Sequence, residues 1–173
     1  TFAEDFFKLQ PKRVVPVIEE EIGMAGICLA PEHGQVFVTF SYHDSSNILR
    51  NNVVRFQSIP RTFSLAPSSL VEFTEIFASF KSVRSHQIGP CQVQDNLLYV
   101  NVADAGEHHE SQVPDSLLGK ILRMNLDGTP ASENPFYQDE NIKNSRNYVW
   151  ASGLRNPFGL KILDDGVFVA DNG

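Results

Sequence analysis

Short stretches in which apolar and polar residues alternate recur along the chain, and this pattern restricts the fold more than any other feature of the sequence. A period of two places alternate side chains on one face of a β-strand, whereas helical periodicity is scarce here. Turn-forming residues cluster between these stretches, at 31–34, 44–47, 95–96, 127–128 and 164–166. We therefore expect an all-β architecture of short strands joined by tight turns. Three strand faces are the clearest: Val36, Val38, Phe40 and Tyr42; Leu98, Val100 and Val102; and Leu122, Met124 and Leu126.

Three further segments are harder to assign. The segment from Ser68 to Phe80 mixes apolar and polar residues in an order that suits a strand as well as a helix, and we interpret it as a strand. Two polar connections, from Ala105 to Ser116 and from Pro130 to Asn147, are long for a compact sheet protein. Connections of this length often cover a binding site, so we expect function there.

The acidic net charge narrows the range of partners. Of the 173 residues, 42% are hydrophobic and 20% are charged, which is ordinary for a globular domain, and the formal net charge is −7. Nucleic acids and anionic membranes are bound through basic faces, so this charge favours a neutral or cationic small substrate. No stretch reaches the roughly 18 to 20 apolar residues that cross a bilayer, so we expect no membrane span. The start, from Thr1 to Lys8, lacks the charged-then-apolar order of a secretory signal. Because a signal could already have been removed, the cellular compartment stays open.

Several conspicuous residues have a structural interpretation that we prefer to a functional one. Two cysteines, Cys28 and Cys91, do not make a disulfide framework, and we expect two buried, unpaired side chains. Adjacent histidines on a polar loop rarely converge on one ion, so we do not expect His108 and His109 to bind a metal. The acidic run Glu19–Glu21 is interpreted as a solvated turn. Three aromatic residues are expected to fill the cores between sheets: Phe136, Trp150 and Phe158.

The C-terminal half carries three motifs in a fixed order. The first is Gly119-Lys120-Ile121-Leu122-Arg123-Met124-Asn125-Leu126-Asp127-Gly128-Thr129, followed by Asn134-Pro135-Phe136 and by Gly153-Leu154-Arg155-Asn156-Pro157. In order and spacing they resemble the glucose/sorbosone dehydrogenase family of soluble, quinone-dependent sugar dehydrogenases. Upstream, two segments resemble earlier elements of the family. The histidine-containing element is matched by Ser85-His86-Gln87-Ile88-Gly89, and the start of the preceding blade by Gly23-Met24-Ala25-Gly26-Ile27.

The resemblance implies a fold and a chemistry. The fold is a six-bladed β-propeller of four-stranded antiparallel blades, of which residues 1–173 would form one incomplete segment of about two to three blades. The cofactor is pyrroloquinoline quinone (PQQ) with calcium, the substrate is an aldose oxidised to its lactone, and electrons leave to an external acceptor. By position, His86 matches the base that takes the anomeric hydroxyl proton, and Arg155 matches a cation at the reactive carbonyl. Asn156 matches a cofactor-contacting amide, and Gly173 could give a carbonyl ligand to calcium.

Some positions depart from the family pattern and keep alternatives open. Ser85 stands where many members have an acidic residue beside the base, so an orienting carboxylate is missing or comes from elsewhere. Glu21 stands where some members have an amide that lines the site, and the segment Gly89-Pro90-Cys91 differs from the usual glycine-rich continuation. Ser85 and the altered glycine segment favour a non-catalytic propeller that acts as a binding scaffold, whereas His86 with Arg155-Asn156 favours an enzyme. A β-sheet protein outside the family would place His86 and Arg155 in no common cleft. The family resemblance alone suggests a periplasmic or secreted protein.

Overall fold

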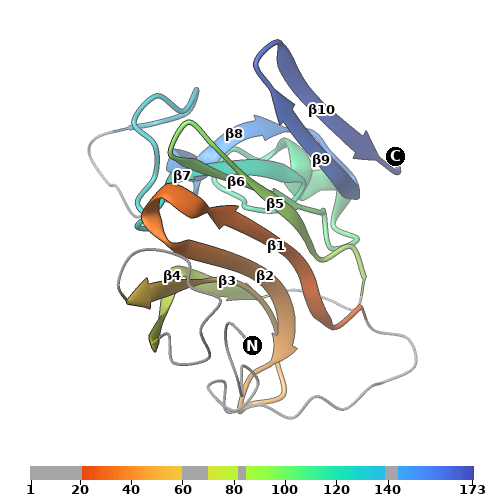
Figure 1. Ribbon diagram of the computed structural model, residues 1–173. Helices are drawn as coiled ribbons and strands as arrows, with labels where there is room; N and C mark the ends of the chain where they lie inside the picture. The colour runs from red at the N-terminus through yellow and green to blue at the C-terminus, as the bar shows by residue number, and fades with distance from the viewer. Residues whose placement is uncertain (1–20, 60–69, 82–84, 139–143) are drawn as a thin grey trace.

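The strands form three antiparallel sheets that lie side by side (Figure 1). The computed structural model describes residues 21–59, 70–81, 85–138 and 144–173. The first sheet contains β1 (Gly23–Ala30), β2 (Gln35–His43), β3 (Leu49–Ile59) and β4 (Leu70–Lys81). The second contains β5 (Ile88–Gln94), β6 (Leu97–Val102), β7 (Lys120–Asn125) and β8 (Val149–Ser152). The third consists of β9 (Pro157–Leu163) and β10 (Gly166–Asp171).

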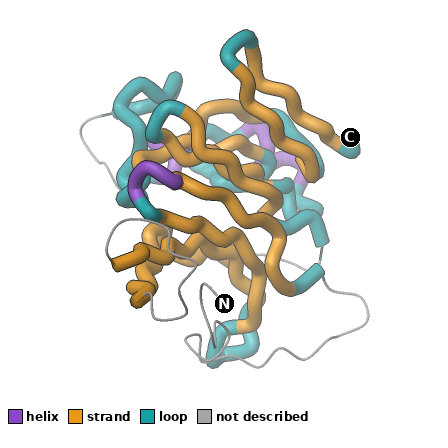
Figure 2. Tube along the Cα trace, in the orientation of Figure 1, coloured by secondary structure: helices purple, strands orange, loops and turns teal. Residues whose placement is uncertain are grey.

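Each four-stranded sheet has the strand order of a propeller blade, in which consecutive strands are neighbours. The all-β prediction is confirmed, as is the strand interpretation of the segment that includes β4. Helices within the described residues are short 3-10 turns in the connections (Figure 2). Their bounds are Pro31–His33 for η1, His108–Gln112 for η2 and Ser145–Tyr148 for η4. The described part contains no helix of the length and apolarity that a membrane span requires.

The main core lies between the first and second sheets and uses the alternating faces expected for β6 and β7, whereas the face expected for β2 forms a separate cluster. Because successive side chains of a strand point to opposite faces, the alternate apolar residues of β6 and β7 reach this core together. A fully buried side chain of this kind stabilises the fold by about 1.5–3 kcal/mol. A second cluster, on the first sheet, contains Val36, Val38, Phe40 and Tyr42. Buried members of the main core include Phe37, Val53, Leu98, Val100, Val102, Leu122, Met124 and Val149.

The first strands of the three sheets, β1, β5 and β9, are neighbours in space (Figure 1). Side-chain amides join the second sheet to the third. The Gln92 side chain donates to the Ile162 carbonyl at 2.8 Å and accepts from the Ile162 N–H at 2.8 Å. The Asn101 amide donates to the carbonyls of Pro157 and Gly159, both at 3.1 Å. This arrangement brings together the connections that precede β5 and β9, which carry His86 and Arg155.

A disulfide joins Cys28 of β1 to Cys91 of β5, which contradicts the expectation of two unpaired cysteines. The two residues are 63 positions apart in sequence, but they lie on first strands of neighbouring sheets, with their Cα atoms 5.8 Å apart. The two strands approach closely here, because a Cβ at Gly26 would lie 2.8 Å from the Pro90 Cα. Sequence spacing carries no signal for a bridge between blades, which is why the interpretation was wrong.

The expectation for the three aromatic residues is confirmed for one of them. Trp150 packs against the cluster between the second and third sheets, edge to face with Tyr99 at a ring separation of 5.7 Å. Phe136 and Phe158 are exposed by 38% and 63%, so neither fills a core. Phe158 lies at the start of β9, directly after the Arg155-Asn156-Pro157 motif, and its ring lines the pocket described below.

Candidate active site

His86 lies in the connection before β5 and is held at its backbone and its ring. Its φ angle is +57°, in the left-handed region that non-glycine residues seldom adopt. Its N–H donates to Oε2 of Glu21 at 2.8 Å, and its carbonyl accepts from the Ala105 N–H at 3.1 Å. Its ring nitrogen Nδ1 lies 2.7 Å from Oδ1 of Asp104. Backbone strain that neighbouring groups maintain in this way is typical of functional sites.

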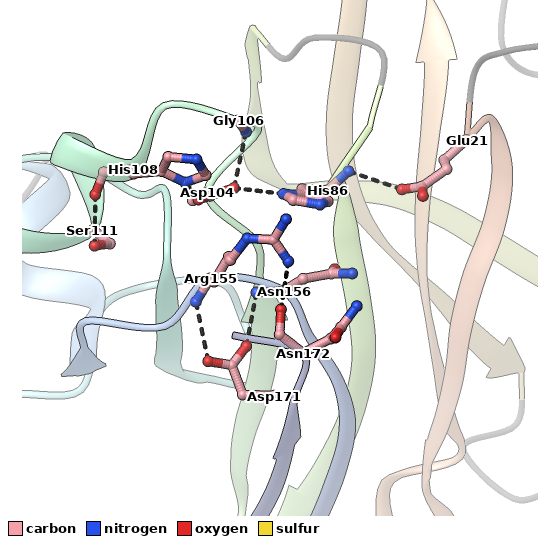
Figure 3. Close-up of polar contacts among 10 residues, drawn as sticks. All are labelled: Glu21, His86, Asp104, Gly106, His108, Ser111, Arg155, Asn156, Asp171 and Asn172. Atoms are coloured by element: carbon pink, nitrogen blue, oxygen red, sulfur yellow. Dashed lines mark hydrogen bonds and ion pairs between the residues drawn. The ribbon is translucent and has the colours of Figure 1, made fainter.

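Asp104 follows β6 and supplies the carboxylate that Ser85 cannot (Figure 3). Its side chain is 1% exposed, whereas that of His86 is 15% exposed. Besides His86, its Oδ1 accepts from the Gly106 N–H at 2.8 Å, and its Oδ2 contacts Nδ1 of His108. The orienting carboxylate therefore comes from elsewhere in the chain, as one alternative in the sequence analysis allowed.

These hydrogen bonds keep Asp104 ionised. Burial acts to raise the pKa of Asp104, but the hydrogen bonds from His86, the Gly106 N–H and His108 outweigh it, so the pKa lies below its usual value. An ionised carboxylate only accepts hydrogen bonds, so the Nδ1 atom of His86 must carry the proton. The neutral imidazole then has an unprotonated Nε2. A ring in this tautomer is prepared to accept a proton at Nε2.

Arg155 and Asn156, in the connection before β9, are fixed by the end of β10. The Asp171 carboxylate accepts from the N–H of Arg155 at 3.1 Å and from the N–H of Asn156 at 2.7 Å. The Arg155 guanidinium donates through Nη1 to the Asn172 carbonyl at 2.6 Å. The Arg155 carbonyl in turn accepts from the Asp104 N–H at 2.8 Å, which links this connection directly to the histidine site.

The predicted residues His86, Arg155 and Asn156 are therefore brought together (Figure 3). Among the described residues, the side-chain amide of Asn156 has no hydrogen-bond partner, so both its donor and its acceptor are available to a ligand. Gly173, the fourth predicted residue, is exposed and lies one position beyond Asn172. Its role as a calcium ligand stays a prediction.

A pocket of about 360 Å³ opens where the first strands of the three sheets meet. That volume is within the range of small-molecule sites. His86 and Arg155 lie next to the lining, because the residue after each of them contributes to it. The acidic Glu21 is exposed, in agreement with a solvated position, and it also lines the pocket; Glu19 and Glu20 lie outside the described residues. The lining includes Glu21, Met24, Ser41, Gln87, Gly89, Asn156 and Phe158.

The Arg155 and Asn156 donors at this pocket fit one polar edge of a planar group such as PQQ, while the lining also contains the Glu21 carboxylate. Arg155 provides a permanent cation, and the free amide of Asn156 can hold a polar edge in plane. For calcium the fit is weaker. The described residues contain no cluster of three or more His, Cys, Asp or Glu side chains that could hold an ion, and the Asn172 carbonyl already accepts from Arg155.

Sequence reasoning missed Asp104 and His108 as members of the site. An Asp followed by Ala105-Gly106 is typical of a turn, and nothing in the linear pattern connects it to a histidine 18 positions earlier. One signal was available, since the long polar connection that begins at Ala105 was expected to carry function. His108 lies on η2 in that connection.

Comparison with known proteins agrees with the family resemblance found in the sequence. The sequence profile of the family described as Glucose / Sorbosone dehydrogenase matches residues 8–173. The HIPL1 protein of Arabidopsis thaliana is 30% identical over 108 residues, which are 50% of this chain and 15% of that protein. The HIPL2 protein of the same plant is 34% identical over 84 residues, 37% of this chain and 12% of that protein.

Solved structures resemble the chain over most of its length. A putative oxidoreductase (glucose dehydrogenase) from Thermus thermophilus has a TM-score of 0.67 at 26% identity, over 90% of this chain and 46% of its own. The PQQ-bound aldose sugar dehydrogenase from Streptomyces coelicolor has a TM-score of 0.63 at 27% identity, over 88% of this chain and 43% of its own. The chain thus spans less than half of these dehydrogenases. With the profile match over nearly the whole sequence, the chain belongs to the glucose/sorbosone dehydrogenase family.

Proposed function

We propose that the protein containing this chain is a quinoprotein oxidoreductase that oxidises an aldose at its anomeric carbon to a lactone. The observation that carries the proposal is the His86–Asp104 pair, 2.7 Å apart, which fixes the tautomer of the neutral His86 ring so that Nε2 is the proton acceptor beside Arg155. Family membership and the resemblance to sugar dehydrogenase structures support the same class of reaction. The protein beyond this chain would complete the propeller.

In this proposal the Nε2 atom of His86 takes the proton of the anomeric hydroxyl. The resulting imidazolium keeps its Nδ1–H bond to Asp104, whose ionised carboxylate stabilises the new positive charge. Because the backbone of His86 is held by Glu21 and Ala105, the ring stays in place while the proton moves. General-base catalysis of this kind contributes about 10² to 10⁴ in rate.

Arg155 and Asn156 would hold the cofactor. When bound, PQQ supplies the acceptor for the hydride released from the anomeric carbon, and an external acceptor then removes the two electrons. The fixed guanidinium of Arg155 would stabilise negative charge that develops at the acceptor, with little reorganisation because Asn172 already anchors it. Calcium, with Gly173 as one carbonyl ligand, remains part of the proposal on family resemblance alone.

The scaffold alternative loses its main argument. It depended on Ser85, which left the base without an acidic neighbour, and Asp104 provides that carboxylate from the end of β6.

A periplasmic or secreted location is supported by the Cys28–Cys91 disulfide, because such bonds persist in oxidising compartments.

Reconstitution of the full-length protein tests the proposal. PQQ and calcium are added, cofactor binding is followed by absorbance, and dye reduction is measured with a panel of aldoses. We expect dye reduction by the unchanged protein and its loss in His86→Ala, with PQQ still bound by the variant. Absence of PQQ binding and of turnover in the unchanged protein would move the assignment to a binding scaffold.

A further inference from the structure

His108 lies outside the motifs of the family resemblance, yet its ring nitrogen Nδ1 is hydrogen-bonded to the second carboxylate oxygen of Asp104, Oδ2 (Figure 3). The carboxylate is 1% exposed and ionised, and it is flanked by imidazoles from two different connections. His86 binds Oδ1 from the connection before β5, and His108 binds Oδ2 from η2. The His108 side chain is itself 68% exposed, so the contact costs little desolvation of that ring.

We propose that His108 is a positioning residue for His86 and acts through Asp104. This inference rests on the proposed function of His86 as a base. A carboxylate bound on one oxygen can rotate about its terminal torsion, which is broad. Hydrogen bonds to both oxygens remove that freedom. With His108 donating Nδ1–H to Oδ2, Oδ1 is directed at Nδ1 of His86, and the hydrogen bond between them keeps its direction.

The loop that carries His108 is built to keep this contact. Lys120 is fully buried, and its ammonium donates to the carbonyls of Glu110 and Ser111 at 2.8 Å and of Leu118 at 2.7 Å. The Ser111 hydroxyl donates to the His108 carbonyl at 2.8 Å. These bonds hold the backbone of η2 through its carbonyl groups. The exposed ring of His108, which contacts Asp104, is therefore attached to a fixed backbone.

The chain offers a matched pair of variants for the test. His108→Ala removes the donor to Asp104, whereas His108→Asn keeps an N–H donor at the position of Nδ1. His109→Ala is the control, because His109 is the exposed neighbour on the same helix η2 and no hydrogen bond joins it to Asp104 among the described residues.

Two readouts are measured on the full-length protein. The first is the strength of the Nδ1–H hydrogen bond of His86, read from ¹H and ¹⁵N chemical shifts of labelled histidine in the protein without cofactor. The second is the kcat and KM of the reconstituted protein. In His108→Ala we expect the Nδ1–H signal of His86 to shift toward that of a weaker hydrogen bond and kcat to fall roughly tenfold with KM unchanged, the effect of losing one hydrogen bond to a charged group. His108→Asn restores both values, and His109→Ala changes neither.

Unchanged His86 signals and unchanged kcat in His108→Ala would overturn the positioning role. So would an equal loss in His108→Asn and His108→Ala that accompanies unfolding, because the role would then be structural. If the unchanged protein shows no turnover but the Nδ1–H signal of His86 still depends on His108, the positioning role stands and the proposed oxidoreductase function fails.

Discussion

Reduction of the Cys28–Cys91 disulfide is expected to lower the free energy of unfolding by about 4 kcal/mol. The bond closes a loop with a sequence separation of 63 residues. Loop closure of that length reduces the entropy of the unfolded chain by about 14 cal/mol/K, which gives the figure quoted at about 25 °C. The two strands also pack against each other around Cys28 in the main core, so the folded state keeps the two cysteines close whether or not they are bonded.

The assay is urea unfolding of the full-length protein, followed by circular dichroism with and without reductant. For a urea dependence of about 3 kcal/mol/M, the reduced protein should reach its midpoint roughly 1.3 M earlier. The double variant Cys28→Ala/Cys91→Ala is the control and should not respond to reductant. Equal midpoints for the oxidised and reduced proteins, or two titratable thiols at these positions before reduction, would refute the reasoning.

Three further changes test the site and its supports. Asp104→Asn keeps the shape of the side chain but places an N–H donor near the base, which reverses its tautomer; we expect kcat to fall by roughly 10² to 10⁴ in the dye-reduction assay. Burial lowers the pKa of Lys120 to about 8, opposed by the Glu110 carboxylate, whereas an unfolded lysine titrates near 10.5. Between these values the unfolded chain binds the extra proton, so the free energy of unfolding rises with pH by up to about 1.4 kcal/mol per unit. Urea midpoints at about pH 7.5 and 9.5 should show this rise, and Lys120→Met should remove it. Gly119→Ala places a methyl group at a φ of +67° and within 2.5 Å of the Leu154 carbonyl oxygen, which should cost at least about 2 kcal/mol in urea unfolding. Gly166→Ala, where the nearest atom is 3.9 Å away, should cost less than about 1 kcal/mol.

Much of the fold could be predicted because strand alternation and turn chemistry are local. The faces that include Val38, Val100 and Met124 all lie in hydrophobic clusters, as their period of two predicts. The packing of one sheet on another is not local. That is why the Cys28–Cys91 bond was missed, and why Phe158 was assigned to a core although it lines the pocket.

The residues of the candidate site also differ in whether local sequence or the packing of distant segments identifies them. His86, Arg155 and Asn156 lie within short motifs, so a family resemblance finds them. Asp104 has no motif of its own, and its function depends on a hydrogen bond to a residue in another connection. Glu21 reads as part of an acidic run, and only the position of β1 beside β5 brings its carboxylate to the His86 N–H.

The amide pairs of Gln92 and Asn101 have a consequence for how finely the site is aligned. The side chain of Gln92 uses its donor and acceptor on Ile162 as a neighbouring peptide group would. It therefore continues the hydrogen-bond ladder across a gap between sheets that share no strand. A slide of β9 by one residue would break both bonds and those of Asn101 to Pro157 and Gly159. The position of Arg155 relative to His86 therefore depends on two uncharged side chains outside the chemistry, in addition to the bond from the Asp104 N–H to the Arg155 carbonyl. Divergence at those two positions would shift the site without altering any residue in it.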